Sequence, residues 1–247
     1  MNPSEPRSRV ADCTASFLFT GRILGKYDVN FYRCDETGFI QTEEPYWLEE
    51  AYADVIAQQD SGLLARCLAF RTVTSLLIKD NFEPNDEFLD YGGGYGVFTR
   101  LMRDDGYAFH HYDPMCQNLF ATDFGADLSR RYAAITAFEV FEHLSQPREV
   151  LRELLDSTDV VFFSTVLQPS PPPESIDSWY YFHPEIGQHI SFFNLASLQS
   201  LARQFDCSLY SNGSTLHAIS KRPLSFSAAR PGMISKIRRA VLRASRA

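Results

Sequence analysis

Several features are missing from this 247-residue sequence, and each absence excludes a class of protein. The longest apolar runs, such as Val160 to Phe163, are far shorter than the roughly 20 residues that cross a membrane. The N-terminus has prolines and polar residues but no apolar region of about 7 to 15 residues, so it does not resemble a secretion signal. We therefore expect a cytoplasmic protein without a transmembrane helix.

The cysteines are few, odd in number and scattered, as Cys13, Cys34, Cys67, Cys116 and Cys207. This distribution argues against a disulfide framework and favours a reducing compartment. Cys67 falls on an apolar helical stripe with three leucines, which predicts core packing for its side chain.

The whole sequence has a net charge of −8, and positively charged residues are scarce in most of it. Six of the 23 bases lie in residues 224–247, where there is no acid, so 17 bases remain against all 31 acids elsewhere. An acidic body repels polyanions, which makes nucleic acid a poor candidate substrate. For the basic tail, a solvated segment is the favoured interpretation; the alternative is a helix that docks on an anionic membrane or an acidic partner.

A glycine-rich segment, FLDYGGGYGVFT at residues 88–99, is the most informative part of the sequence. An apolar strand ends on Asp90, and Gly92, Gly94 and Gly96 follow at alternate positions. Without a Cβ, such a backbone turns sharply and lets a ligand lie against it. A dinucleotide fingerprint, GxGxxG, fails in both registers because Val97 and Thr99 stand where small residues are needed. The segment predicts a cofactor loop and argues against an NAD-type oxidoreductase.

A second acid supports this interpretation. The strand at residues 107–112 ends on Asp113, about 20 residues beyond the glycines, where a carboxylate can accept hydrogen bonds from a ribose diol. A strand, glycine loop, helix, strand and acid in this order predict a nucleoside-containing cofactor rather than a simple turn.

The order of elements predicts an α/β fold with a sheet covered by helices on both faces. Helices are expected from Pro45 to Gln59, from Leu63 to about Lys79, and after an Asn194 cap. The connection from Asp113 to Leu119 is too short for a usual crossover helix, so one helix is expected to be reduced or absent. Seven strands are expected: Phe88 to Tyr91, Ala108 to Tyr112, Leu119 to Thr122, Ala134 to Phe138, Val160 to Thr165, Cys207 to Ser211 and Thr215 to Ser220.

Four parts of the chain are expected. Residues 1–44 form a β-rich cap with short strands around the turn at Asp35 to Gly38, and residues 45–80 form a helical lead-in or lid. Residues 81–223 form the core domain, and residues 224–247 the basic tail. A proline-rich stretch at residues 167–188 is too long for an ordinary loop of a compact domain, which predicts a lid or a wall of a substrate pocket.

The pattern Asp90-x-Gly92-x-Gly94-x-Gly96 resembles motif I of class I S-adenosylmethionine-dependent methyltransferases. The segment AITAFEVFEHL at residues 134–144 is similar to a later strand of that superfamily, so the resemblance covers residues 86–222. It implies a Rossmann-like, seven-stranded, mostly parallel sheet. PYWL at residues 45–48 and GQHIS at residues 187–191 are similar to bacterial methyltransferases that modify sugars or surface polysaccharides.

The same resemblance bears on metal binding. Such enzymes often carry an N-terminal zinc ribbon with two CxxC pairs, but here a single cysteine, Cys13 or Cys34, stands at each place. Two thiolates do not complete a tetrahedral zinc site, so we expect a degenerate ribbon and no metal in the protein.

The resemblance assigns S-adenosylmethionine as cofactor, with S-adenosylhomocysteine as product. It implies that Asp90 and the three glycines hold the methionyl end and that Asp113 holds the ribose. Further candidate contacts are Pro114 on the adenine face, Asp123 and Phe124 beside the adenine, and Glu139 facing the pocket. Met115 is placed either on the adenine or in the core.

For catalysis, methyl transfer to a hydroxyl or a carbon acid needs alignment, desolvation and a base. By resemblance, His189 is the first candidate base, because an imidazole titrates near neutrality; the alternative is a histidine that only hydrogen-bonds the loop. His143 ranks second, since in many relatives the equivalent residue is structural. Candidate substrate contacts are aromatic or imidazole side chains: Tyr46, Trp47, Tyr180, Tyr181 and His183.

These observations predict a metal-independent methyltransferase for a small molecule, such as a sugar, a nucleotide-sugar or a glycan end, with a role in polysaccharide biosynthesis. The fourth expected strand is not followed by the Asn/Asp-Pro-Pro-aromatic motif of nucleic-acid amino-methylating enzymes. The alternative is a non-catalytic module that uses the fold for interaction.

Overall fold

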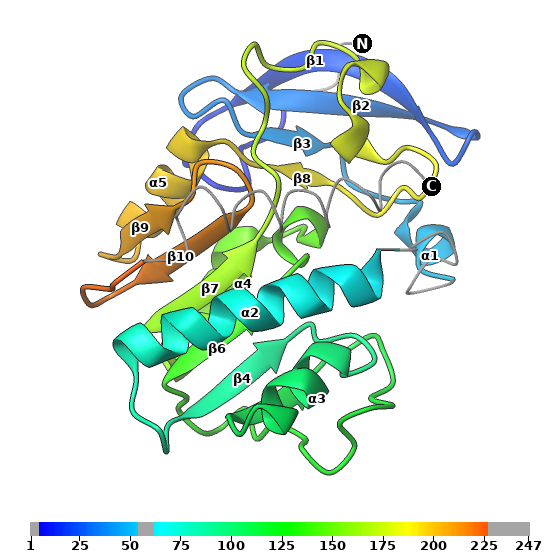
Figure 1. Ribbon diagram of the computed structural model, residues 1–247. Helices are drawn as coiled ribbons and strands as arrows, with labels where there is room; N and C mark the ends of the chain where they lie inside the picture. Colours follow the sequence, from blue (N-terminus) through cyan, green and yellow to red (C-terminus); the bar gives the residue numbers. More distant parts are fainter. Residues whose placement is uncertain (1–4, 54–61, 227–247) are drawn as a thin grey trace.

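The structure is a computed structural model that describes residues 5–53 and 62–226. Within these residues the strands form two sheets (Figure 1). The smaller sheet is antiparallel in the order β1-β2-β3-β8, with bounds Ala15–Ile23 (β1), Tyr27–Cys34 (β2), Ile40–Thr42 (β3) and Ser191–Phe192 (β8). The larger sheet has the order β5-β4-β6-β7-β10-β9, with bounds Glu87–Tyr91 (β4), Ala108–Tyr112 (β5), Ala134–Ala137 (β6), Val160–Ser164 (β7), Ser208–Ser211 (β9) and Leu216–Ser220 (β10).

In the larger sheet, β5, β4, β6 and β7 run parallel, and β10 is antiparallel to both of its neighbours. The expected α/β fold with a mostly parallel, Rossmann-like sheet is therefore confirmed. The helices are α1 (Leu48–Ala51), α2 (Leu63–Asn81), α3 (Val97–Asp104), α4 (Pro147–Ser157) and α5 (Leu195–Arg203), with single 3-10 turns η1 (Phe141–His143), η2 (Ile176–Ser178) and η3 (Tyr180–Phe182). None of the helices in the described part of the chain combines the length and apolarity of a membrane span.

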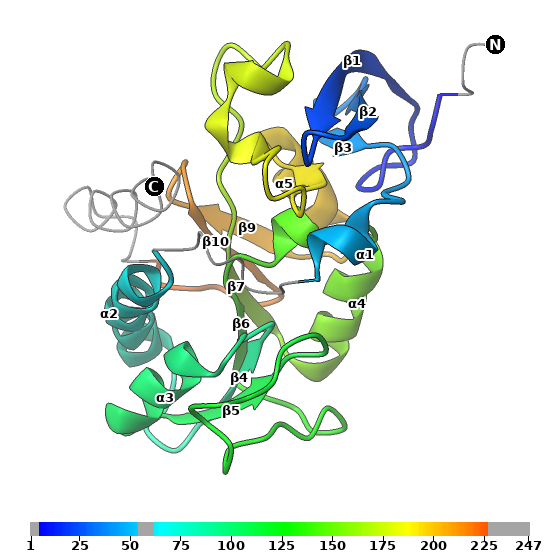
Figure 2. The same ribbon diagram turned by 90° about the vertical axis from the view of Figure 1, so that its right-hand side faces the viewer.

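Side chains of successive strand residues point to opposite faces of the larger sheet, and two apolar clusters result. Phe88 and Phe162 pack with α2 and α3 on one face, whereas Leu89 and Phe163 pack with α4 and α5 on the other. Figure 2 shows α2 and α3 on one side of the sheet and α4 on the opposite side. Because both faces are covered, β6 and β7 are buried at every position, as expected of parallel strands.

The third expected strand, Leu119 to Thr122, is wrong, so the described sheet has six strands rather than seven. Leu119 and Phe120 are more than half exposed there. The Asn118 side-chain amide donates to the Ala121 carbonyl oxygen and accepts a hydrogen bond from the Ala121 N–H. These two bonds form a turn and disfavour an extended backbone. The segment between β5 and β6 contains no helix, as the short connection predicted.

The N-terminal cap has the expected strands on both sides of the turn at Asp35 to Gly38, which joins β2 to β3. A further turn at residues 24–26 joins β1 to β2. The sheet takes its fourth strand, β8, from residues 191–192, so the cap is not contained in residues 1–44. The helix expected from Pro45 to Gln59 is helical at Leu48–Ala51, and its residues 54–59 lie outside the described part.

The predicted Asn194 cap of α5 is confirmed. The Asn194 side chain accepts a hydrogen bond from the Ser197 N–H, and the Ser197 hydroxyl reciprocates at the Asn194 N–H. The last described residues of the chain lie beside α2, where the Ser225 N–H donates to Asn81 Oδ1 at 2.7 Å. Most of the basic tail, residues 227–247, lies outside the described residues.

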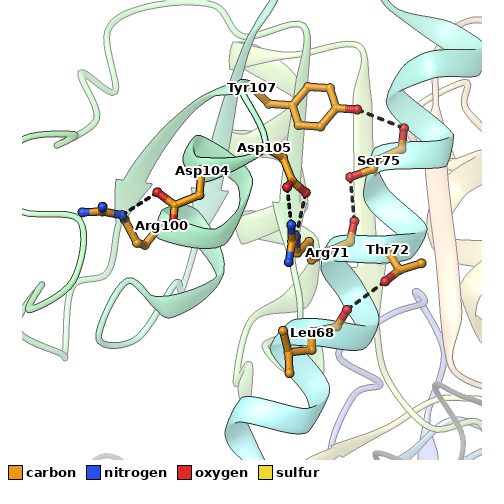
Figure 3. A network of polar contacts seen from close by, with 8 residues as sticks. All are labelled: Leu68, Arg71, Thr72, Ser75, Arg100, Asp104, Asp105 and Tyr107. Atoms are coloured by element: carbon orange, nitrogen blue, oxygen red, sulfur yellow. Dashed lines mark hydrogen bonds and ion pairs between the residues drawn. The ribbon is translucent and has the colours of Figure 1, made fainter.

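Helix α2 is fastened to the end of α3 by polar contacts (Figure 3). Arg71 forms a two-pronged ion pair with Asp105, with a Nε–Oδ2 distance of 2.6 Å, and Tyr107 donates to the Ser75 carbonyl oxygen. The hydrogen bond from Arg71 lowers the pKa of Asp105. Since α3 begins at the glycine loop, these contacts fix that loop relative to α2.

A buried histidine in β10 makes the stability of the fold sensitive to acid. His217 lies between the Thr165 carbonyl oxygen and the Ser211 hydroxyl, and burial lowers its pKa from 6.5 to about 4. The unfolded chain therefore binds a proton that the folded protein excludes, and stability falls as the pH drops below 6.5 toward 4. Relative to pH 7, His217 should cost about 2 kcal/mol of stability at pH 5.

His217→Gln should remove this pH dependence. Urea unfolding at pH 7 and pH 5 measures it, because the buried acids Asp90 and Glu142 titrate alike in both proteins and cancel in the difference. An equal loss of stability between the two pH values in variant and wild type would contradict the prediction.

Candidate active site

The glycine loop joins the end of β4 to the start of α3 at the carboxyl edge of the larger sheet. Gly92 has φ +69°, and a Cβ there would lie 2.6 Å from Val140 Cγ2. A Cβ on Gly93 would lie 2.5 Å from Asp90 Oδ2. Neither position accepts a side chain without movement of its neighbours, so the loop leaves bare backbone facing the cavity beside it.

Asp90, near the end of β4, is hydrogen-bonded to side chains of α3 and β6. Its Oδ2 accepts a hydrogen bond from the Thr99 hydroxyl at 2.7 Å and its Oδ1 one from Thr136 at 3.1 Å. Burial raises the pKa of Asp90 to about 6, although the bond from Thr99 opposes the rise. The side chain is 2% exposed, so the structure shows a positioning role, and direct contact with a cofactor stays a prediction.

Asp113 follows β5 and reaches across to the loop. Its Oδ2 accepts the Gly94 N–H at 2.8 Å, and its Oδ1 accepts the N–H groups of Met115 and Cys116, each at 2.8 Å. His111 Nε2 lies 2.9 Å from the Gly94 carbonyl oxygen. Together these bonds hold the tip of the glycine loop at a fixed distance from the acid.

The loop and Asp113 form one end of a cavity of about 480 Å³. The Gly92 to Gly94 backbone, Asp113, Pro114 and Met115 line this end. The opposite end is built by η1 and the proline-rich segment, so this segment forms a wall of the cavity; that the cavity binds the substrate stays a prediction. The residues at that end are Glu142, His143, Tyr180, Tyr181, His183, Gln188 and His189.

His189 is held in one tautomer by the backbone. Its Nδ1 lies 2.7 Å from the Tyr181 carbonyl oxygen, which can only accept, so Nδ1 carries the hydrogen and Nε2 carries a free lone pair. The rings of His143 and His183 lie 4.9 and 5.1 Å from that of His189. Desolvation, with His143 and His183 nearby, lowers the pKa of His189 well below 6.5, so the imidazole is neutral at pH 7.

His143 is tied to the same wall. Its Nδ1 lies 3.1 Å from the Tyr52 hydroxyl and 3.2 Å from the Gln188 carbonyl oxygen. Burial lowers the pKa of His143 to about 4. The contacts of His143 with both Tyr52 and Gln188 fit a structural, orienting role. This is the role for which His143 was ranked second to His189 as the base.

Glu142 is a buried acid that the sequence did not single out for the site. Its Oε1 accepts the Tyr181 hydroxyl at 2.7 Å, and its Oε2 has no hydrogen-bond partner among the described residues. Burial, reinforced by Glu139, raises the pKa of Glu142 to about 8. Glu142, His143 and His189 each offer a ligand atom within 4.8 Å of the others, so a metal ion could bind here; the expected absence of metal stays a prediction.

Arg66 and Glu139 pair across the middle of the cavity at 3.6 Å. Glu139 has φ +55°, and Ser164 bonds both its N–H, at 2.7 Å, and its Oε1, at 2.6 Å. Arg66 and Cys67 both line the cavity from α2, so Cys67 does not serve in core packing alone. The helical pattern of α2 was the available signal for Arg66, a base that faces the same side as buried residues.

Five expected contacts are absent from the cavity: Gly96, which immediately precedes α3 and where a Cβ would meet Asn118 and Ala121, and four further residues. Trp47 is 1% exposed and donates to the Gly187 carbonyl oxygen at 2.8 Å, so it is a core residue, whereas Tyr46 is 62% exposed on the outer surface. Asp123 and Phe124 line a different hollow, where the Arg103 guanidinium lies 3.8 Å from the Phe124 ring centre. The structure therefore corrects the assignment of Tyr46 and Trp47 to substrate and of Asp123 and Phe124 to the adenine.

The fold and the site define the protein class: a mostly parallel sheet in an α/β fold, whose glycine loop and neighbouring acid line one cavity, is that of the class I S-adenosylmethionine-dependent methyltransferases. A family model described as a methyltransferase domain matches residues 63–212. The chain belongs to this methyltransferase family. No curated protein matches the sequence.

Solved structures share this fold at low identity. An O-methyltransferase family protein from Burkholderia thailandensis has a TM-score of 0.51 and 10% identity, covering 72% of this chain and 64% of that one. CalO1, a methyltransferase in calicheamicin biosynthesis, has a TM-score of 0.50 and 11% identity, covering 72% and 60%. A complex of a methyltransferase with the Trm112 activator from Haloferax volcanii has a TM-score of 0.50 and 14% identity, covering 73% and 100%. The chain thus spans less than two thirds of the first two proteins.

Proposed function

We propose that this methyltransferase acts on a hydroxyl or a carbon acid of a small molecule, such as a sugar, a nucleotide-sugar or a glycan end, with His189 as the base. One observation carries the proposal: the glycine loop with Asp113 and the unprotonated Nε2 of His189 face the same cavity of about 480 Å³. CalO1 is a small-molecule biosynthetic enzyme of the same fold, which supports a small acceptor here.

The residues at the loop end fit an adenosyl cofactor. Bare backbone at Gly92 to Gly94 admits close approach, Asp113 offers carboxylate oxygens for ribose hydroxyls, and Pro114 with Met115 offers apolar surface for adenine. When bound, S-adenosylmethionine supplies an electrophilic methyl group on a sulfonium. Glu139 and Arg66, at the middle of the cavity, are placed for the charged groups of the methionyl end.

The residues at the wall end supply base and orientation. Nε2 of His189 takes a proton from the acceptor while Nδ1–H stays bonded to the Tyr181 carbonyl oxygen, so the imidazolium that forms keeps a hydrogen-bond partner. Tyr181, in turn, donates to Glu142 and fixes the segment that carries this carbonyl. Glu142 is buried and His189 half-buried, and this limited access of water favours transfer to the acceptor rather than to solvent.

Two measurements test the function. Titration with S-adenosylhomocysteine should give saturable binding and raise the melting temperature, because the ligand binds only the folded state. A screen of nucleotide-sugars and glycan fragments with methyl-labelled cofactor should then identify an acceptor. Saturable binding without transfer to any acceptor of these classes would favour the alternative, a non-catalytic module.

We further propose that transfer is metal-independent, because burial raises the pKa of Glu142 and a cation would have to displace the proton of this carboxyl group before it could bind. Excess EDTA should leave turnover unchanged, measured with the identified acceptor. Zn²⁺ should inhibit, since the two neutral imidazoles of His143 and His189 bind it and occupy the base. Loss of turnover on chelation, restored by a divalent ion, would contradict this prediction.

A further inference from the structure

Two cysteines of the N-terminal sheet lie in direct contact. Cys34 is the last residue of β2, opposite Ala15 of β1, and Cys13 precedes β1 by two residues. Their Sγ atoms are 2.8 Å apart, and the two residues are 9% and 1% exposed. Apolar atoms that merely pack lie about 3.5–4.0 Å apart, so this contact is closer than hydrophobic burial of two thiols produces.

The two thiols differ in chemistry. Burial acts to raise the pKa of Cys34, but hydrogen bonds from Cys13, Thr37 and Ser8 outweigh it and lower the pKa. The Thr37 N–H lies 3.4 Å from Cys34 Sγ. Burial and the bond to Cys34 instead raise the pKa of Cys13 to about 11. Cys34 is thus the more readily deprotonated of the two thiols, and the thiolate is the nucleophilic form.

We propose that Cys13 and Cys34 are a site of reversible disulfide modification, oxidised by peroxide and reopened by a dithiol. Cys34 thiolate attacks hydrogen peroxide and, with a proton, gives a sulfenic acid and water. The Cys13 sulfur then attacks the Cys34 sulfur, forming the S–S bond and releasing a second water. Both thiols lose one electron and one proton each, and the peroxide is reduced to two waters.

The bond would fasten a segment that braces the proposed base. Arg9 lies just before Cys13, and its guanidinium donates to the carbonyl oxygens of Ile190, Thr42 and Glu43 at 3.0, 3.0 and 3.1 Å. Ile190 follows His189 directly. Joining Cys13 to β2 ties the Arg9 segment to the sheet, so the disulfide would stabilise these contacts, which are already formed with both cysteines free.

Peptide mapping of the intact protein tests the proposal. Native protein is treated with hydrogen peroxide, alkylated without reductant and digested with trypsin. We expect peptide 10–22 joined to peptide 34–66, a link that dithiothreitol removes. We also expect the melting temperature of oxidised protein to rise by roughly 5–10 °C over reduced protein.

Two variants serve as the test and its matched control. Cys13→Ser should abolish both the linked peptide and the rise in melting temperature, whereas Cys207→Ser, which changes another buried cysteine, should keep both. If Cys13→Ser does not fold, the wild-type map decides alone. The proposal is overturned if Cys34 is found alkylated after peroxide treatment, if it links equally to Cys67, Cys116 or Cys207, or if oxidation leaves the melting temperature unchanged.

Discussion

Asp113→Ala is expected to weaken S-adenosylhomocysteine binding roughly 100-fold, because two charge-assisted hydrogen bonds to a ribose diol are lost. The same carboxylate also holds the Gly94 N–H at 2.8 Å, so its removal frees the tip of the glycine loop. Isothermal titration calorimetry of the purified protein measures the effect without knowledge of the acceptor. An unchanged dissociation constant would remove Asp113 from the ribose.

Asp123→Ala is the matched control for this experiment. Asp123 is an acid ten residues further on, exposed beside the hollow formed with Arg103 rather than in the main cavity. Its loss should leave the affinity within about 2-fold of wild type, as expected of a residue without ligand contact. A large effect at Asp123 and none at Asp113 would restore the sequence-based assignment of the adenine and refute the structural one.

Features that depend only on residues close together in the sequence could be predicted from the sequence. The positions of Asp90, the glycines and Asp113 follow from the need for bare backbone at a strand end, and the structure has this arrangement. The Asn194 cap is equally local, since donor and acceptor lie three residues apart. These features depend on few neighbours, so a single sequence specifies them.

Long-range contacts were not readable in the same way. Trp47 looked available to substrate, but its burial depends on Gly187, 140 residues away. β8 pairs with β3 across a similar separation, which no periodicity reveals. Leu119 to Thr122 has the apolar composition of a strand, but the outer side of β5 pairs instead with Gly125, in an isolated bridge to His111, and a turn forms at Asn118 to Ala121.

The same limit applies within the site. His189 was found through resemblance, whereas Tyr52, Arg66 and Glu142 were missed because a helical or strand pattern does not distinguish a cavity wall from the core. Glu142 is fully buried, as a core residue would be, and only its unpartnered Oε2 marks it as part of a site. A sequence pattern does not give the distances between side chains, and these distances define such a site.

His189→Gln is expected to lower turnover by roughly 100- to 10,000-fold, the usual contribution of a general base, once an acceptor is known. Glutamine has no basic nitrogen, but its amide can still donate to the Tyr181 carbonyl oxygen that His189 bonds at 2.7 Å. Affinity for S-adenosylhomocysteine should stay near wild type, because the glycine loop and Asp113 are untouched. Full turnover in the variant would show that His189 only holds the loop.

The pH profile separates the base from a structural histidine. Burial with His143 and His183 nearby lowers the pKa of His189 well below 6.5, so the unprotonated base persists as the pH falls past 6.5 and is lost only when the pH passes its folded-state pKa. We expect kcat/KM to stay level from pH 8 to pH 6.5 and to decline in more acidic buffer. His183→Gln removes a neighbouring imidazole whose charge opposes that of His189, so it should move this decline to higher pH. A residue that merely supports the loop would lower activity at every pH alike, so a shift of the acidic limb in His183→Gln shows that a histidine beside His183 accepts the proton. Because His183 lowers the pKa of His143 as well, loss of the acidic limb in His189→Gln is the result that assigns this proton to His189.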